Sequence, residues 1–245
     1  MPSRPNAFIF AGANASGKST FISHLIKDNI IDGEYVNPDL ILKMELKAEE
    51  NIENYTKAFK IAEERRYKLV KNKKNIILET VFSTEEKIDF VKHLKEEGYH
   101  VTVFFTGTES PHINATYLMQ RVLNGGHDVP LRKLISRRER GFKNIVVASS
   151  IVDCLIYVDN SIANSPPLIV LSLYSGKKCF ENINFDRNVS WYKPLISKID
   201  SVVLESDMLE KHISFCNIIQ ESVQTFSDTL DKTYDEKNII LSGNS

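Results

Sequence analysis

A nine-residue loop near the N-terminus combines the residue types and the spacing that phosphate chemistry requires. In residues 12–20, Gly-Ala-Asn-Ala-Ser-Gly-Lys-Ser-Thr, two glycines separated by four residues precede a lysine and a hydroxyl residue, which is the P-loop pattern. The glycines let the backbone turn so that its N–H groups face a polyphosphate. Lys18 can reach the β- and γ-phosphates, and the Ser19 hydroxyl can bind Mg²⁺. The pattern predicts a nucleoside triphosphate site formed by Gly12, Ala13, Asn14, Ala15, Ser16, Gly17, Lys18, Ser19 and Thr20.

Asp39 is the first candidate for acid–base chemistry. It follows Asn37 and Pro38, directly after a short stretch that is typical of a strand. Its carboxylate can take the proton from an acceptor hydroxyl or help to hold Mg²⁺. The alternative is an acidic residue in the first turn of a helix, where it suits the helix dipole. We expect Asn37 to cap this helix, with Pro38 as its first residue, and to line the acceptor site beside Asp39.

Glu79 is the second candidate carboxylate. It ends an aliphatic run, where a charge is costly unless the strand emerges into a polar cleft. We expect Glu79, with Thr80 and Ser83, to bind the acceptor or a metal-bound water. The alternative is a glutamate at a strand end without a role in binding. Asp159 and Asn160 follow another apolar run; Asp159 resembles a Walker B aspartate, and a simple turn explains it equally well.

Basic side chains surround a glycine-rich break at residues 125–130. They are Arg121, Arg132, Lys133, Arg137, Arg138 and Arg140. A glycine-hinged lid that brings guanidinium groups onto a transferring phosphoryl group would stabilise its developing charge. Arg137 and Arg140 are three residues apart and share a helix face. The alternative is a solvated basic helix or a surface that binds RNA, although no aromatic residues alternate with the arginines.

Alternating strand and helix patterns position these side chains. Strands are predicted at 7–11, 34–36, 75–80, 100–105, 154–158 and 168–173, and helices at 18–26, 37–44, 52–70, 85–97, 110–124 and 131–147. In the long helix, Ile52, Tyr55, Phe59, Ala62, Leu69 and Val70 form the apolar stripe. This alternation predicts an α/β fold of the P-loop NTPase/kinase type, with a mainly parallel sheet and helices on both faces. Ligands bind beyond the carboxyl ends of such strands, where all the candidate residues fall.

The alternation stops after Lys178. We therefore expect an α/β domain over residues 1–178 and a helical C-terminal extension over residues 179–245, with helices at 188–200 and 205–232. The role of the extension is left open.

The overall composition is that of an ordinary globular chain of 245 residues, 42% hydrophobic and 26% charged. A net charge of −1 gives no field that would favour binding to nucleic acid or to an anionic membrane. We find no leader sequence and no membrane-spanning stretch, and three scattered cysteines without metal-ligand spacing, which predicts a cytoplasmic protein with reduced thiols.

Five motifs together resemble the compact form of the zeta toxin family of P-loop kinases. They are residues 12–20, Val36-Asn37-Pro38-Asp39, Leu78-Glu79-Thr80, Gly125-Gly126-His127-Asp128-Val129-Pro130, and Arg137 with Arg140, Gly141 and Asn144. The resemblance covers residues 6 to 176.

The resemblance implies a kinase that depends on ATP or GTP and on Mg²⁺. Family members phosphorylate the 3′-hydroxyl of the amino sugar in UDP-N-acetylglucosamine and act as toxins paired with an antitoxin, and relatives use other nucleotide sugars or NAD. By motif, Asp39 resembles the base and Glu79 the acceptor-binding carboxylate, whereas Arg121, Arg137 and Arg140 resemble the arginines on the transferring phosphate. We assign His127, in the glycine-rich break, to the substrate site.

Two other functions remain open from the sequence. The acceptor can be another small alcohol, such as NAD or an antibiotic. Alternatively, the chain is a regulatory nucleotide-binding module that does no chemistry, whose partner contacts the C-terminal extension. A transporter ATPase is excluded because its Leu-Ser-Gly-Gly-Gln signature is missing from the sequence.

Overall fold

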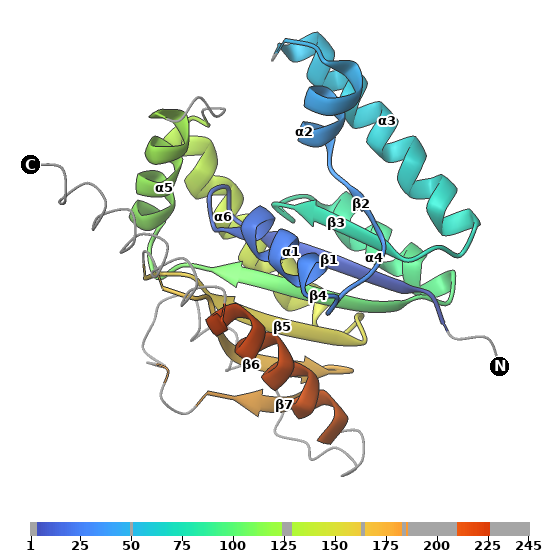
Figure 1. Ribbon diagram of the computed structural model, residues 1–245, viewed down its shortest axis with the longest axis vertical. Coiled ribbons are helices and arrows are strands. Elements are labelled where there is room, and N and C mark those ends of the chain that lie inside the picture. Colours follow the sequence, from blue (N-terminus) through green and yellow to red (C-terminus); the bar gives the residue numbers. More distant parts are fainter. Residues whose placement is uncertain are drawn as a thin grey trace, which may run out of the picture.

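The computed structural model describes residues 4–49, 51–123, 129–162, 165–182, 185 and 210–225. Its strands are β1 (Asn6–Gly12), β2 (Glu34–Val36), β3 (Ile76–Thr80), β4 (His100–Gly107), β5 (Cys154–Asp159), β6 (Leu168–Tyr174) and β7 (Lys177–Glu181). They form one sheet in the order β2-β3-β1-β4-β5-β6-β7, which Figure 1 shows from the side of α1. The strands from β2 to β5 run parallel, and β6 and β7 are antiparallel to their neighbours. The predicted α/β fold with a mainly parallel sheet is confirmed.

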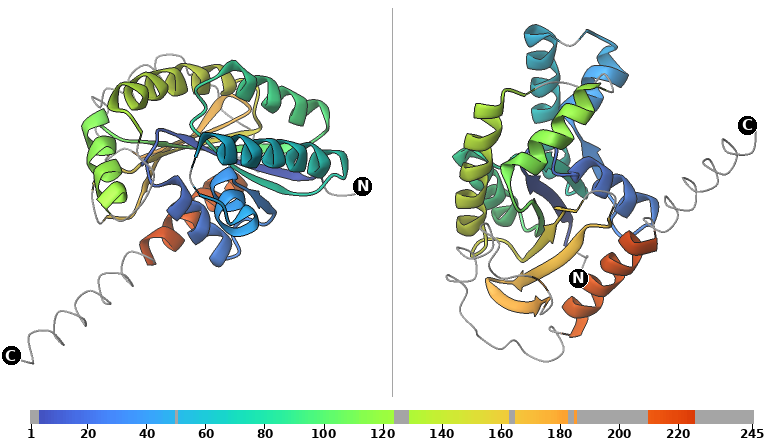
Figure 2. Two further views of the ribbon diagram at one scale, coloured as in Figure 1. Left: turned by 90° about the horizontal axis from the view of Figure 1, so that it is seen from above. Right: turned by 90° about the vertical axis from the view of Figure 1, so that its left-hand side faces the viewer.

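The helices cover both faces of this sheet. They are α1 (Lys18–Lys27), α2 (Pro38–Leu40), the π-helix η1 (Ile41–Leu46), α3 (Ile52–Lys71), α4 (Glu85–Glu96), α5 (Pro111–Leu123), α6 (Leu131–Ala148) and a C-terminal helix over residues 210–225. In the left view of Figure 2, α4 and α6 lie on one face, and α1 and the C-terminal helix lie on the other. None of the helices in the described ranges is long and apolar enough to span a lipid bilayer.

The central strand β1 shows why both faces need a cover. Its side chains alternate, so that Ala7 and Ile9 belong to the core under α3, α4 and α6, whereas Phe8 and Phe10 belong to the core under α1. Phe10 stacks on Phe104 of β4 with the ring centroids 4.6 Å apart. This central, doubly covered strand leads directly into the P-loop and holds its first residue rigidly in the sheet.

The sequence prediction missed one strand, and the C-terminal helix that it expected is present. Strand β7 crosses the expected end of the α/β alternation at residue 178 and adds a half-exposed edge to the sheet. The C-terminal helix packs Cys216, Ile219 and Val223 into the same core as α1. Of the extension helices that the sequence predicts, the one at 188–200 lies outside the described residues, and the one at 205–232 is described over 210–225.

The helices near the predicted acceptor site also differ in detail. As predicted, Asn37 caps α2, and its side-chain oxygen accepts a hydrogen bond from Asp39 N at 2.8 Å. After Leu40 the chain continues as the π-helix η1, which the sequence prediction missed. The predicted apolar stripe of α3 is wrong at two positions, because Ile52 is 87% exposed and Phe59 is 55% exposed.

Candidate active site

The P-loop joins the end of β1 to the start of α1. Gly12 has φ 146° and lies against the backbone of Thr106, where a Cβ atom would collide. Gly17 caps α1 in the left-handed region, with φ 85°. Both positions therefore require glycine, as the motif predicts, and Lys18 opens the helix whose positive dipole end faces the loop.

Side chains from three parts of the chain bind the carbonyl oxygens of the P-loop. Lys18 Nζ donates to Ala13 O at 2.7 Å, and Asn160 Nδ2 donates to Ser16 O at 3.0 Å. Asn114, fully buried in α5, contacts Ala15 O at 3.4 Å. Because the carbonyl oxygens are occupied on one side, the loop is held in a curved shape that suits a row of N–H groups facing phosphate. The sequence analysis missed Asn114, since no motif includes it.

The carboxylate of Glu79, at the end of β3, lies beside the P-loop. The hydroxyl oxygen of Ser19 is 3.0 Å from both of its oxygens, and Lys18 Nζ is 3.9 Å from Oε1. The pairing of β1 with β3 sets Glu79 level with Phe10, two residues before Gly12. The polar strand end that the sequence indicated therefore reaches the predicted phosphate site.

Tyr35 of β2 and Asn37, the residue that follows β2, also contact the carboxylate of Glu79. The phenol hydroxyl of Tyr35 donates a hydrogen bond to Glu79 Oε2 at 2.6 Å. Asn37 Nδ2 donates to the Tyr35 oxygen at 2.8 Å and contacts Glu79 Oε2 at 3.3 Å. Burial, and after it the charge of Glu79, raises the pKa of Tyr35, whose phenol is the donor in this contact. The sequence analysis did not identify Tyr35.

A cleft of about 910 Å³ brings most of the predicted residues together. It is lined by Asn14, Ala15, Ser16, Gly17, Lys18, Ser19, Thr20, Asn37, Asp39, Glu79, Thr80, Ser83, Arg137 and Arg140, among others. Gly12 and Ala13 shape the loop beneath it and are not lining residues. Arg121 belongs to α5, but its side chain is not described, and His127 lies outside the described residues.

The arginines of α6 have different environments. Arg137 lines the cleft, and Arg140 Nε donates to Ser83 O at 3.1 Å. Arg138 turns away to donate to Thr108 O at 2.7 Å, and its guanidinium lies 4.8 Å from the ring centroid of Phe142. Burial lowers the pKa of Arg138. Arg137 and Arg140 therefore lie in the same cleft as the P-loop, whereas Arg138 links α6 to the loop after β4.

Close backbone contacts fix α6 beside the loop after β3. A Cβ atom on Gly141 would lie 2.9 Å from Val81 O, so only glycine allows this approach. Asn144 Nδ2 donates to Phe82 O at 2.9 Å, and Phe82 N donates to Thr80 Oγ1 at 3.0 Å. Thr80 therefore shapes the loop through its hydroxyl, in addition to lining the cleft.

The cleft has further lining residues that the sequence analysis did not assign to it. They are Tyr55, Phe59 and Arg66 of α3, Lys87 of α4 and Tyr117 of α5. Burial, and next the charge of Arg66, lowers the pKa of Lys87. These residues occupy ordinary positions of amphipathic helices, and only the fold shows that they face the cleft.

The donor set fits Mg²⁺ at the P-loop. Among the described residues, no group of three or more His, Cys, Asp or Glu side chains could hold a metal ion by itself. Magnesium in kinases is held by one or two protein oxygens together with nucleotide phosphates, and the Ser19 hydroxyl can supply one such oxygen. Asp159 accepts hydrogen bonds from Ser161 N at 3.2 Å and Ser161 Oγ at 2.7 Å, an arrangement typical of the simple turn.

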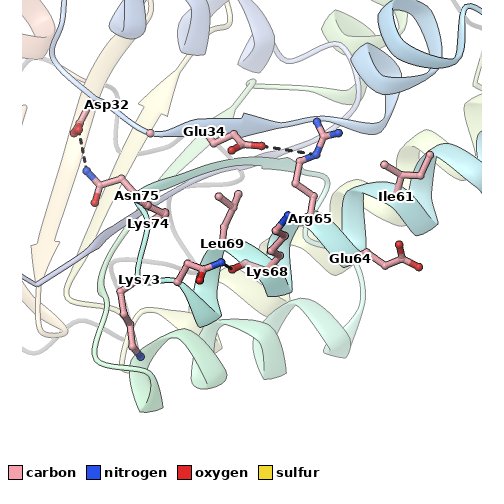
Figure 3. A pocket seen from close by; sticks show the side chains of 12 residues that line it. Asp32, Glu34, Ile61, Glu64, Arg65, Lys68, Leu69, Lys73, Lys74 and Asn75 are labelled. Carbon is pink, nitrogen blue, oxygen red and sulfur yellow. Dashed lines mark hydrogen bonds and ion pairs between the residues drawn. The ribbon is translucent and has the colours of Figure 1, made fainter.

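A second pocket, of about 1000 Å³, lies at the opposite ends of the strands (Figure 3). It is lined by residues before β2 and β3 and along α3. Asn75 Nδ2 donates to Asp32 there at 2.9 Å, and Arg65 pairs with Glu34 at 3.7 Å. None of the predicted chemistry falls in it, and ligands of parallel sheets bind at the carboxyl ends. The cleft at the P-loop is therefore the candidate active site.

Comparisons with solved structures agree with the fold described above. The comparison with curated proteins gave no match. A solved structure from the PezAT toxin–antitoxin system of Streptococcus pneumoniae has TM-score 0.52 and 16% identity, covering 88% of this chain and 87% of that one. The AvrRxo1-ORF1:AvrRxo1-ORF2 complex with sulfate ions has TM-score 0.57 and 16% identity, covering 92% and 81%. The same complex with ATP has TM-score 0.57 and 15% identity, covering 91% and 77%. At these identities the likeness shows the fold.

A family model gives the assignment that the fold alone does not. The model described as zeta toxin matches residues 1–161, which include the P-loop, both carboxylates and the arginines of α6. The chain therefore belongs to the zeta toxin family of P-loop kinases.

Proposed function

We propose that the chain transfers the γ-phosphate of ATP or GTP to a sugar hydroxyl of a nucleotide-linked metabolite such as UDP-N-acetylglucosamine. One observation carries this proposal: Asp39 and Glu79 line the same cleft as the P-loop. A nucleotide-binding module would need the loop alone. The similar complex solved with ATP supports ATP as the donor.

The P-loop, the two carboxylates and Arg137 have different roles in the proposed transfer. The P-loop N–H groups and Lys18 bind the phosphates, and Arg137 stabilises the charge that develops on the transferring group. Asp39 accepts the proton of the acceptor hydroxyl. At the same time the hydroxyl oxygen bonds to the γ-phosphorus, and the nucleoside diphosphate leaves. Mg²⁺, when bound, neutralises charge on the phosphate oxygens. Glu79 binds and orients the acceptor.

The wall that α3 and α4 contribute to the cleft supports an acceptor that carries phosphate. Arg66 and Lys87 both line the cleft and are half-buried, which is costly for two like charges, and the charges of Glu63 and Glu86 offset this cost only in part. An anionic acceptor would offset this cost. The exposed ring of Phe59 lies on the same wall and offers a stacking surface for a ring of the acceptor. A nucleotide sugar has both features, as does NAD, and a neutral alcohol has neither.

A toxin role with an antitoxin partner is part of the proposal. The similar PezAT structure belongs to a toxin–antitoxin system, and the AvrRxo1 structures are complexes of two proteins. This likeness supports a protein partner for the present chain as well.

The test is to incubate the purified protein with Mg·ATP, or Mg·GTP, and a panel of nucleotide sugars, NAD and aminoglycosides. We expect a mass increase of one phosphoryl group on one class of acceptor, and none with Lys18→Ala or Asp39→Ala. Asp39→Ala should still bind nucleotide. Nucleotide binding by the wild-type protein without transfer to any acceptor would contradict the kinase and favour the regulatory module.

A further inference from the structure

We infer that Tyr35 is a positioning residue for the acceptor-binding carboxylate of Glu79, an assignment that rests on the proposed function. Tyr35 is half-buried on the edge strand β2 and donates to Glu79 Oε2 at 2.6 Å, the shortest of the contacts to this carboxylate. The phenol does not itself line the cleft. It therefore acts through Glu79 and not by touching the substrate.

The contacts of Glu79 fall into two groups. The first group is Lys18 and Ser19 of the P-loop, whose side chains phosphates and Mg²⁺ use in P-loop proteins. The second group is Tyr35 and Asn37, which come from β2 and the residue after it and not from the P-loop. When a bound nucleotide engages Lys18 and Ser19, Tyr35 and Asn37 still hold the carboxylate of Glu79 in place. The direction in which Glu79 meets the acceptor thus depends on Tyr35.

Asn37 connects this anchor to the proposed base. Its Nδ2 atom donates to the Tyr35 oxygen at 2.8 Å, while its Oδ1 atom accepts from Asp39 N at 2.8 Å. One short chain of hydrogen bonds therefore links the carboxylate of Glu79 to the backbone N–H of Asp39, the proposed base.

The direct test is Tyr35→Phe, which removes the hydroxyl and keeps the packed ring. We expect kcat/KM for the acceptor to fall by about tenfold to a hundredfold, the range for losing a hydrogen bond to a charged group, with the loss mainly in the acceptor KM. The Kd for nucleotide should stay within about twofold, since Tyr35 does not contact the P-loop in the described structure. The matched control is Tyr67→Phe, a half-exposed tyrosine of α3 outside the cleft, which should change neither constant.

A thermal-unfolding cycle gives a readout that does not need activity. Tyr35→Phe should lower Tm by about 2–4 °C in the wild-type background and by much less in a Glu79→Ala background. Equal decreases in Tm in both backgrounds would contradict a stabilising hydrogen bond between Tyr35 and Glu79. Wild-type transfer with an unchanged acceptor KM in Tyr35→Phe would overturn the positioning role alone, whereas no transfer by the wild-type protein would overturn the proposed function.

Discussion

The hydroxyl oxygen of Ser19 lies 3.0 Å from both carboxylate oxygens of Glu79, although 60 residues separate them in the chain. Lys18 Nζ lies 3.9 Å from the same carboxylate. The two P-loop side chains that phosphates and Mg²⁺ need are thus in contact with an acidic residue of the neighbouring strand. A nucleotide must displace these contacts and must accept a negative charge beside its phosphates.

Glu79→Gln should therefore bind nucleotide more tightly and transfer phosphate more slowly. We expect the Kd of Mg·ATP, measured by calorimetry, to decrease by about threefold to tenfold, because one competing charge is lost. Glu86→Gln is the control, since Glu86 is an exposed carboxylate of α4 that lines the same cleft. Weaker nucleotide binding by Glu79→Gln would show that Glu79 helps to hold the metal instead.

Arg137→Ala should lower kcat far more than nucleotide affinity. The side chain lines the cleft from α6, and the loss of one charge-stabilising donor costs roughly a hundredfold to a thousandfold in rate. Arg132→Ala, on an exposed position of the same helix, should leave both constants unchanged. An equal loss of rate and affinity in steady-state kinetics would make Arg137 a plain binding residue.

Arg66→Met and Lys87→Met should each raise the acceptor KM about tenfold for a phosphate-bearing acceptor, since each removes one charge–phosphate contact and keeps the apolar stem. The exposed Lys92→Met of α4 is the control. The experiment compares each acceptor with its dephosphorylated form, whose KM should not respond to these changes. A response of both forms alike would place the two side chains outside any anion site.

Asn114→Ala should weaken both the fold and the nucleotide site. The buried side chain links Thr108, 2.6 Å away, to the P-loop carbonyl of Ala15. Its removal leaves buried groups unpaired, at a cost of about 1–3 kcal/mol in the free energy of unfolding. Denaturant unfolding and nucleotide titration measure the two effects, and the exposed Gln120→Ala of α5 is the control. A stability loss with unchanged nucleotide affinity would separate Asn114 from the P-loop.

The stability of the fold should decrease with acidification between pH 6.5 and 4. Burial, and next the charge of His100, lowers the pKa of His212 to about 4, in a site formed with Cys154, Cys216 and Tyr174. In this window the unfolded chain binds a proton that the folded chain does not, so about 3 kcal/mol of stability is lost as pH falls. Denaturant melts of His212→Gln should show a flatter pH dependence, whereas the exposed His112→Gln should keep the wild-type slope.

The features that the sequence revealed are those carried by contiguous residues. The P-loop, the cap at Asn37 and the charged end of the β3 strand each follow from local chemistry. The sequence analysis missed Tyr35 and Asn114 because their hydrogen-bond partners lie 44 and 99 residues away in the chain. Arg66 and Phe59 occupy positions that periodicity assigns to a solvated face or to a core, and only the packing of α3 in the folded chain brings them to the cleft.

The strand β2 lies at the edge of the sheet, is three residues long and is paired on one side only, with β3. In the proposed reaction, the nucleotide is bound at the end of the interior strand β1. Tyr35, Asn37 and Asp39 lie instead on the short edge strand β2 or directly after it. In the proposed transfer, the acceptor side of the site therefore depends on a short edge strand, and a redesign of the acceptor preference should begin at its half-buried and exposed positions and leave the buried Val36 unchanged.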